Sequence, residues 1–138
     1  MLLWHDYPRM GVDNRNQFAM YEDLPGGLNG LKSLVDKAHA RGVQVYLPYK
    51  PWDIMVKNQN HYDEEAKISK AIGADGIFLD TMKDSEIAFR KALDAVNPDN
   101  VFASEGRPGL ADAQLVTGSW NQVGTQTNVM PSIDLFRF

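Results

Sequence analysis

Apolar positions along the chain alternate between helical and strand spacing. In residues 31–38 they recur at the i, i+3, i+4, i+7 spacing of one helix face, and Gly42 follows as the expected end of that helix. Residues 43–47, with the sequence VQVYL, then predict a buried strand that Pro48 and Pro51 stop. The first unit of this pattern is therefore a helix followed by a strand.

The same unit occurs twice more. Apolar stripes at 68–72 and 89–96 predict two further helices, and each is followed by a short apolar strand. The five candidate strands are residues 2–6, 43–47, 76–80, 101–105 and 114–119. Residues 8–25 are expected to form a long loop of the kind that often shapes a pocket.

Strands that alternate with helices of this length predict an α/β fold with a parallel sheet. An open doubly wound sheet and a (β/α)₈ barrel both fit, but the glycine-rich phosphate turns of the first are absent. A full barrel needs eight units and about 250 residues. The chain of 138 residues is therefore expected to be a single partial barrel domain, 1–138, that holds about strands 2 to 6.

The two ends of the sequence support that expectation. Both stop in apolar runs, so they look cut, and the missing strands would leave open sheet edges. The expected partners are therefore a second copy of the chain, as in a homo-oligomer, or the missing remainder of the barrel.

Composition and charge narrow the classes of function. Apolar residues are 43% and charged residues 23%, as in globular domains, and the net charge of -4 without a basic run disfavours nucleic acid. No signal peptide or membrane span is expected at the N-terminus. The chain has no Cys and its three His residues are scattered, so no metal site and no cofactor are expected, and the compartment stays open.

Two carboxyl groups follow neighbouring strands. Asp80 ends the apolar strand 76–80, and Glu105 ends the next one. Neighbouring strands lie about 4.8 Å apart, so the two side chains can face one pocket as a catalytic acid/base and nucleophile pair. The structural alternatives are a helix cap or a Lys83 ion pair for Asp80, and an ion pair with Arg107 for Glu105.

Other polar and aromatic residues lie at the predicted strand ends, where a barrel gathers its functional side chains. Tryptophans could stack on sugar faces and the polar groups could bind hydroxyls, although such residues also serve as packing lids or solvated charges. The candidates for substrate binding are Asp6, Tyr49, Lys50, Trp52, Asp53, Arg107 and Trp120, with His5 a weaker one.

Two segments resemble known enzymes. The run "GLKSLVDKAHARGVQVYL" at 30–47 is similar to the helix and strand of barrel glycosidases of the α-amylase, α-glucosidase and α-galactosidase type. The run "GADGIFLDTM" at 73–82 resembles their fourth strand, which ends in the nucleophilic Asp. The resemblance covers about residues 2–120, and the first, seventh and eighth strands have no counterpart.

The resemblance implies a retaining glycoside hydrolase acting on a carbohydrate, with Asp80 as the nucleophile. Glu105 matches the acid/base of the α-amylase arrangement, whereas the other two families use an Asp of the sixth strand, for which 114–121 offers no counterpart at a strand end. The alternative from another class is a catalytically inactive barrel fragment that binds a carbohydrate or a partner without turnover.

Overall fold

The computed structural model describes residues 1–5, 15–54 and 60–120, which form a mixed α/β fold. In this part of the chain there are four helices: α1 (Gln17–Asp23), α2 (Gly27–His39), α3 (His61–Ile72) and α4 (Ile87–Val96). The four described strands are β1 (Tyr46–Tyr49), β2 (Gly76–Leu79), β3 (Val101–Ser104) and β4 (Gly118–Ser119). They pair in parallel in the order β1-β2-β3-β4, which confirms the predicted α/β class and parallel sheet.

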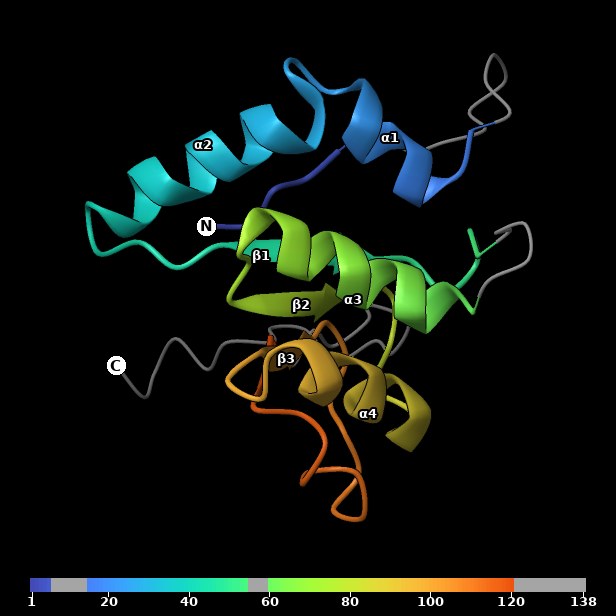
Figure 1. The fold of residues 1–138 in the computed structure, drawn as a ribbon. Coiled ribbons are helices and arrows are strands. Elements are labelled where there is room, and N and C mark those ends of the chain that lie inside the picture. Colours follow the sequence, from blue (N-terminus) through green and yellow to red (C-terminus); the bar gives the residue numbers. More distant parts are fainter. Residues whose placement is uncertain (6–14, 55–59, 121–138) are drawn as a thin grey trace, which may run out of the picture.

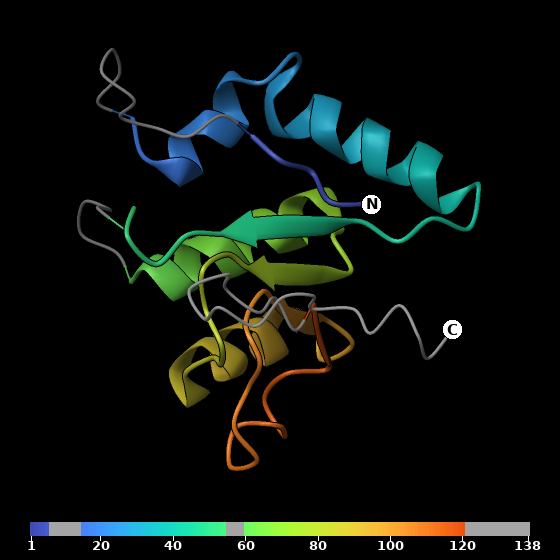
Figure 2. The same ribbon diagram turned by 180° about the vertical axis from the view of Figure 1, so that it is seen from behind.

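Helices α3 and α4 lie on the same face of the sheet (Figures 1 and 2). α3 connects β1 to β2 and α4 connects β2 to β3, so each connection returns to the neighbouring strand. α1 and α2 lie beside the N-terminal segment, next to β1 (Figure 1). Figure 2 shows the sheet from the side opposite α3 and α4.

Aromatic side chains form the core between the sheet and its helices. The Tyr49 ring from β1 lies 4.7 Å from the Phe89 ring of α4, which in turn lies 4.9 Å from Phe102 of β3. Tyr62 of α3 stacks on Phe89 at 4.5 Å. All four side chains are buried, so this face of the sheet is a packed core.

Strand β1 lies further along the chain than the predicted strand 43–47 and runs through Pro48. The Tyr46 N–H donates to the Met1 carbonyl, so the backbone of Tyr46, and of Pro48 two residues later, faces the N-terminal segment. The N–H that Pro48 lacks would point to that side. Its absence therefore leaves the pairing of β1 with β2 intact. The Tyr21 hydroxyl donates to the Pro48 carbonyl at 3.2 Å.

The predicted loop 8–25 contains helix α1 in its described part. The Asn16 side chain caps this helix by accepting from the N–H groups of Phe18 and Ala19. The helix has only seven residues, and Phe18 and Tyr21 supply its apolar contacts, which is too short a stripe for the periodicity to predict.

Two other predicted strands are shorter than expected. Of residues 2–6, Leu2 alone forms a bridge, to Tyr46 of β1, and Asp6 lies outside the described residues. Of residues 114–119, the strand includes Gly118 and Ser119. Both lie at the edges of the described sheet, where a strand has a neighbour on one side at most.

None of the helices in residues 15–54 and 60–120 is long and apolar enough to cross a membrane.

Candidate active site

Four side chains follow directly after the four described strands. The register aligns Tyr49, Leu79, Ser104 and Ser119, so the next residues, Lys50, Asp80, Glu105 and Trp120, reach the same edge of the sheet. Backbone hydrogen bonds continue the alignment by one residue. The Asp80 N–H donates to the Tyr49 carbonyl at 3.0 Å, and the Trp120 N–H to the Ser104 carbonyl at 2.9 Å.

The sheet face opposite α3 and α4 carries aromatic side chains. The Phe78 ring lies 4.2 Å from Trp120 and 6.0 Å from Trp4. Phe78 is buried, whereas Trp4 and Trp120 are 43% and 62% exposed. Because side chains alternate along a strand, Asp80 belongs to the same face as Phe78. The carboxyl end of the sheet thus combines acidic groups with half-exposed aromatic rings.

Asp80 and Glu105 lie close enough for their carboxyl groups to interact. Burial raises the pKa of Asp80, and the Glu105 charge and a hydrogen bond between the two carboxyls raise it further. The Lys50 charge and the Thr81 backbone act in the opposite direction. Asp80 is 4% exposed, and no described residue hydrogen-bonds its Oδ2 atom. The Asp80 carboxyl therefore favours its neutral form more than a solvent-exposed aspartic acid does.

Lys50 is fully buried at the end of β1. Its Nζ atom lies 3.3 Å from His5 Nδ1, 5.3 Å from the Trp4 ring centroid and 6.0 Å from that of Trp52. Aromatic faces attract a cation, and this attraction grows where water is excluded. The Lys50 ammonium, which lies near the Trp4 and Trp52 rings, therefore supplies positive charge beside Asp80.

Gln17 of α1 holds the backbone at this end of β1. Its side-chain NH₂ donates to the carbonyls of Lys50 and Asp53 at 2.7 and 2.6 Å, and its oxygen accepts from the Lys50 N–H at 2.8 Å. Gln17, Lys50 and Asp53 are all fully buried. α1 therefore fixes the chain around Lys50 through three hydrogen bonds of the Gln17 side-chain amide.

A second buried carboxyl lies on α3. Glu65 is fully buried, and no described residue hydrogen-bonds either carboxyl oxygen. Burial, and less strongly the charge of Glu64, raises the pKa of Glu65 to about 8, while Lys50 lowers it. Glu65 is therefore largely protonated at neutral pH.

The structure separates the predicted substrate-binding residues into two groups. Lys50, Trp52 and Trp120 lie at the carboxyl end of the sheet with Asp80, and Asp53 lies buried beside Lys50 beneath α1. His5 joins them through its contact with Lys50.

Tyr49 faces away from the carboxyl pair, and Arg107 does not form the ion pair with Glu105 that the sequence offered as an alternative. The Tyr49 side chain faces the helices, and its hydroxyl lies 2.8 Å from His61 Nδ1. Arg107 is exposed, and the structure contains no ion pair between it and Glu105, although it describes both residues. Asp6 lies outside the described residues.

The sequence patterns do not single out Gln17, Glu65 or Thr81. Glu65 could have been found, because Tyr62, Glu65 and Ile72 recur on the buried face of α3 at helical spacing. Thr81 carries no sequence signal, since its contact with the pair is made by its backbone N–H, which donates to Glu105 Oε2 at 2.6 Å.

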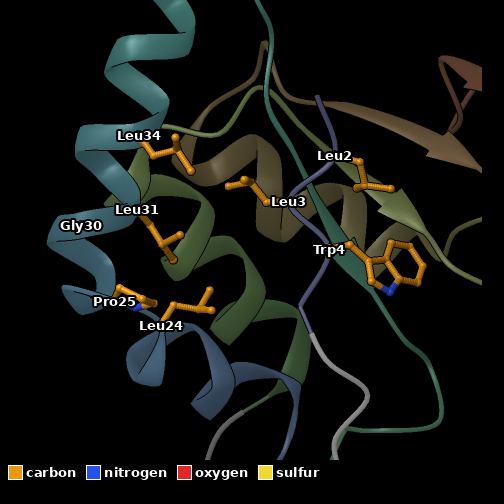
Figure 3. A pocket seen from close by; sticks show the side chains of 8 residues that line it. All are labelled: Leu2, Leu3, Trp4, Leu24, Pro25, Gly30, Leu31 and Leu34. Atoms are coloured by element: carbon orange, nitrogen blue, oxygen red, sulfur yellow. The ribbon is translucent and has the colours of Figure 1, made fainter.

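A hollow of about 560 Å³ lies at another place, between the N-terminal segment and α2 (Figure 3). Figure 3 shows Leu3, Leu31 and Leu34 in this hollow, with Leu24 and Pro25 at its end. None of its lining residues is acidic, basic or nucleophilic. This hollow is apolar and offers no group for catalysis.

In residues 1–5, 15–54 and 60–120, no cluster of three or more His, Asp or Glu side chains could hold a metal ion. Comparisons of the chain with protein-family models, with curated proteins and with solved structures found no significant match.

Proposed function

We propose that this chain forms part of a (β/α)₈-barrel glycoside hydrolase that cleaves O-glycosyl bonds in a carbohydrate, with Asp80 as the nucleophile and Glu105 as the acid/base. One observation carries the proposal: the two carboxyls follow directly after neighbouring parallel strands and interact with each other at one end of the sheet. Acid/base and nucleophilic sugar chemistry requires such a pair of carboxyl groups.

The strand order supports the partial barrel. Successive strands are neighbours, and α3 and α4 lie on the same face (Figures 1 and 2). A doubly wound sheet reverses its order and carries helices on both faces. A barrel wall keeps sequential order with its helices outside, and its functional groups gather at the carboxyl ends of the strands, where Asp80 and Glu105 lie.

The proposed reaction has two steps. In the first, an Asp80 oxygen attacks the anomeric carbon while Glu105 gives its proton to the leaving oxygen, and a glycosyl ester forms on Asp80. In the second, Glu105 takes a proton from water, the water oxygen attacks the anomeric carbon, and the bond to Asp80 breaks. Lys50 favours the charged form of Asp80 that the first step needs.

Substrate contacts would come from the exposed rings. Trp52 and Trp120 are 49% and 62% exposed near the pair, as aromatic platforms for a sugar need to be. Retaining glycosidases hold their carboxyls about 5 to 5.5 Å apart, a spacing that side chains after two neighbouring strands can reach.

The exposed rings of Trp52 and Trp120 favour a second candidate function, a carbohydrate-binding domain without turnover. If a sugar binds on the tryptophans without reaching the two carboxyls, neither attack nor proton donation can occur.

Hydrolysis of 4-nitrophenyl α-glucoside and 4-nitrophenyl α-galactoside by the full chain tests the proposal. We expect Asp80→Asn to lower kcat by roughly 10⁴-fold or more, because the nucleophile is lost. We expect Glu105→Gln to lower it by roughly 10² to 10⁴-fold. The matched control, Asp36→Asn, changes an exposed carboxylate that pairs with Lys32 on α2 and should leave kcat unchanged.

Hydrolysis that survives Asp80→Asn would refute the role of nucleophile. Binding of methyl α-glucoside or methyl α-galactoside by a wild-type chain that hydrolyses neither aryl glycoside would favour the binding function instead. Titration calorimetry measures that binding directly.

A further inference from the structure

A second hollow lies on the sheet face that carries the carboxyl pair. Its volume is about 300 Å³, smaller than that of the hollow beside α2. The described residues that line it are all apolar or aromatic: Met1, Leu2, Tyr46, Phe78, Ala103 and Trp120. An apolar cavity of about 150 Å³ is enough to bind benzene. This second hollow therefore has the volume to hold an aromatic ring with its substituents.

Small residues in one row of the sheet create the hollow. The register aligns Phe78 with Ala103, and Ala103 with Gly118, so the large Phe78 ring is followed by a methyl group and then by no side chain. A Cβ atom at Gly118 would have no described atom within 4 Å apart from its neighbours in the chain. Open space therefore extends over β3 and β4 beside the Phe78 ring.

The row of residues below closes the floor of the hollow. A Cβ atom at Gly76 would lie 2.6 Å from Tyr46 Cε1 and 2.7 Å from Val101 Cγ2, so these two side chains fill the space over Gly76. Trp120 lies nearer the carboxyl end, where its ring contacts Phe78 at 4.2 Å and is 62% exposed. A ligand can therefore enter past the Trp120 ring.

The hollow lies directly beneath the carboxyl pair. Phe78 precedes Asp80 by two residues, and Ala103 precedes Glu105 by two. Residues two apart in a strand point to the same face and lie about 6 to 7 Å apart. The neighbours of Glu105 on this face are thus Ala103 below it and Trp120 beside it in the register, and both line the hollow.

This placement matches the direction of the proposed reaction. Glu105 gives its proton to the leaving oxygen, so the leaving group must lie beside Glu105, on the side of the hollow. The opposite side of the pair is polar, because Lys50 follows β1 next to Asp80, with His5 Nδ1 at 3.3 Å from its Nζ atom. A ligand that suits both sides joins a polar sugar to an apolar group.

We propose that the hollow lined by Phe78, Ala103 and Trp120 binds the leaving group, and that the substrate is a glycoside with an aromatic aglycone. The assignment of the ring as a leaving group rests on the proposed glycosidase function. The affinity of the hollow for an aromatic ring does not depend on turnover.

Benzyl alcohol, a neutral aromatic probe without a sugar, tests the hollow in the full chain labelled with ¹³C at the alanine methyl groups. We expect the Ala103 methyl resonance to shift and saturate as the probe is added. The Ala66 methyl, buried on α3 at the other face of the sheet, should stay constant.

Gly118→Leu places a side chain in the open space and keeps the Ala103 methyl as the reporter. Gly118 does not have a positive φ, so the substitution introduces no backbone strain. We expect the variant to lose the Ala103 shift. Ala40→Leu, which adds the same side chain at an exposed position after α2, is the matched control and should keep it.

Phenyl and methyl glycosides then link the hollow to the sugar. Titration calorimetry on Asp80→Asn, which prevents turnover, compares the phenyl and methyl forms of α-glucoside and α-galactoside. We expect the phenyl form to bind roughly 10 to 100-fold more tightly, because the ring leaves water. Adding Gly118→Leu should remove this difference.

An Ala103 methyl that does not respond to benzyl alcohol would overturn the proposal, and so would equal affinities for the phenyl and methyl glycosides. A response that persists in Gly118→Leu would place the probe elsewhere and would also overturn it. An Ala103 response in a chain that hydrolyses neither 4-nitrophenyl glycoside would support the aromatic site and refute the glycosidase function, so the two failures are distinct.

Discussion

Buried ionisable side chains determine much of the chemistry at the residue scale. Lys50, Glu65 and Asp80 are each almost completely buried near the end of β1, where solvent cannot screen them. Lys50 interacts with both carboxyl groups, and burial favours the neutral form of each. The protonation of one group therefore affects the others, and pH becomes the natural variable with which to study the site.

Glu65 should make the protein less stable as pH rises. The pKa of its carboxyl is raised from 4.5 to about 8 in the folded protein, so between these values the folded state holds a proton that the unfolded state has lost. The free energy of unfolding must then decrease from about pH 4.5 to about pH 8.

We expect Glu65→Gln to remove that contribution. Relative to the wild type, the variant should gain at least about 1.4 kcal/mol of stability between pH 5 and pH 8.5, the value of one pKa unit. Urea denaturation at the two pH values measures this difference. Glu22→Gln on the exposed face of α1 is the control, and an equal slope in wild type and Glu65→Gln would contradict the prediction.

At the element scale, sequence patterns were most informative where an element packs along its whole length. The stripes at 31–38 and 89–96 lie within α2 and α4, and the runs at 76–80 and 101–105 match β2 and β3 to within one residue. Helices cover one face of these central strands, and every residue of β2 is buried.

The elements at the edges were less predictable because other contacts define them. Proline ordinarily marks the end of a strand, but at Pro48 the missing donor faces the N-terminal segment, so β1 continues. Both Tyr49 and Lys50 were predicted to line the pocket. In the observed register of β1, Tyr49 faces α4, whereas Lys50 interacts with Asp80. A difference of one residue along a strand decides which face a side chain occupies.

Helix α1 should lose its hold on β1 when Gln17 is replaced by Leu. The substitution leaves the Lys50 N–H and two carbonyls buried without their partner, and each such group costs about 1 to 3 kcal/mol. We expect the free energy of unfolding to fall by at least about 2 kcal/mol in urea denaturation. Glu22→Ala, on the exposed face of the same helix, should change it by less than about 0.5 kcal/mol. Equal effects of the two substitutions would show that Gln17 does not hold the strand.

At the scale of the whole molecule, the two faces of the sheet differ in their cover. One face packs on α3 and α4 (Figures 1 and 2). On the other face, Phe78 lies between two half-exposed tryptophans. The same face bears the carboxyl pair at its end. Within the described residues, the face with the proposed chemistry is thus lined by aromatic rings and not by α3 and α4.

This difference predicts unequal costs for two similar substitutions. Phe102→Ala should destabilise the protein by about 3 to 5 kcal/mol, because Phe102 is fully buried between β3 and α4. Phe78→Ala should cost less, because the Trp4 and Trp120 rings beside it are half-exposed and can move into the space. Urea denaturation of both variants measures the difference, and a larger loss for Phe78→Ala would mean that the second face is as tightly packed as the first.

The three tryptophans of the chain all lie around the candidate site. Trp4 and Trp52 flank the Lys50 ammonium, and Trp120 follows β4 beside Phe78. Indole fluorescence depends on the polarity around the ring and on neighbouring charges, and each of these rings is between 43% and 62% exposed. The intrinsic tryptophan fluorescence of the protein therefore arises next to the carboxyl pair. A ligand that binds at this site should change that fluorescence, so binding can be followed without an added dye.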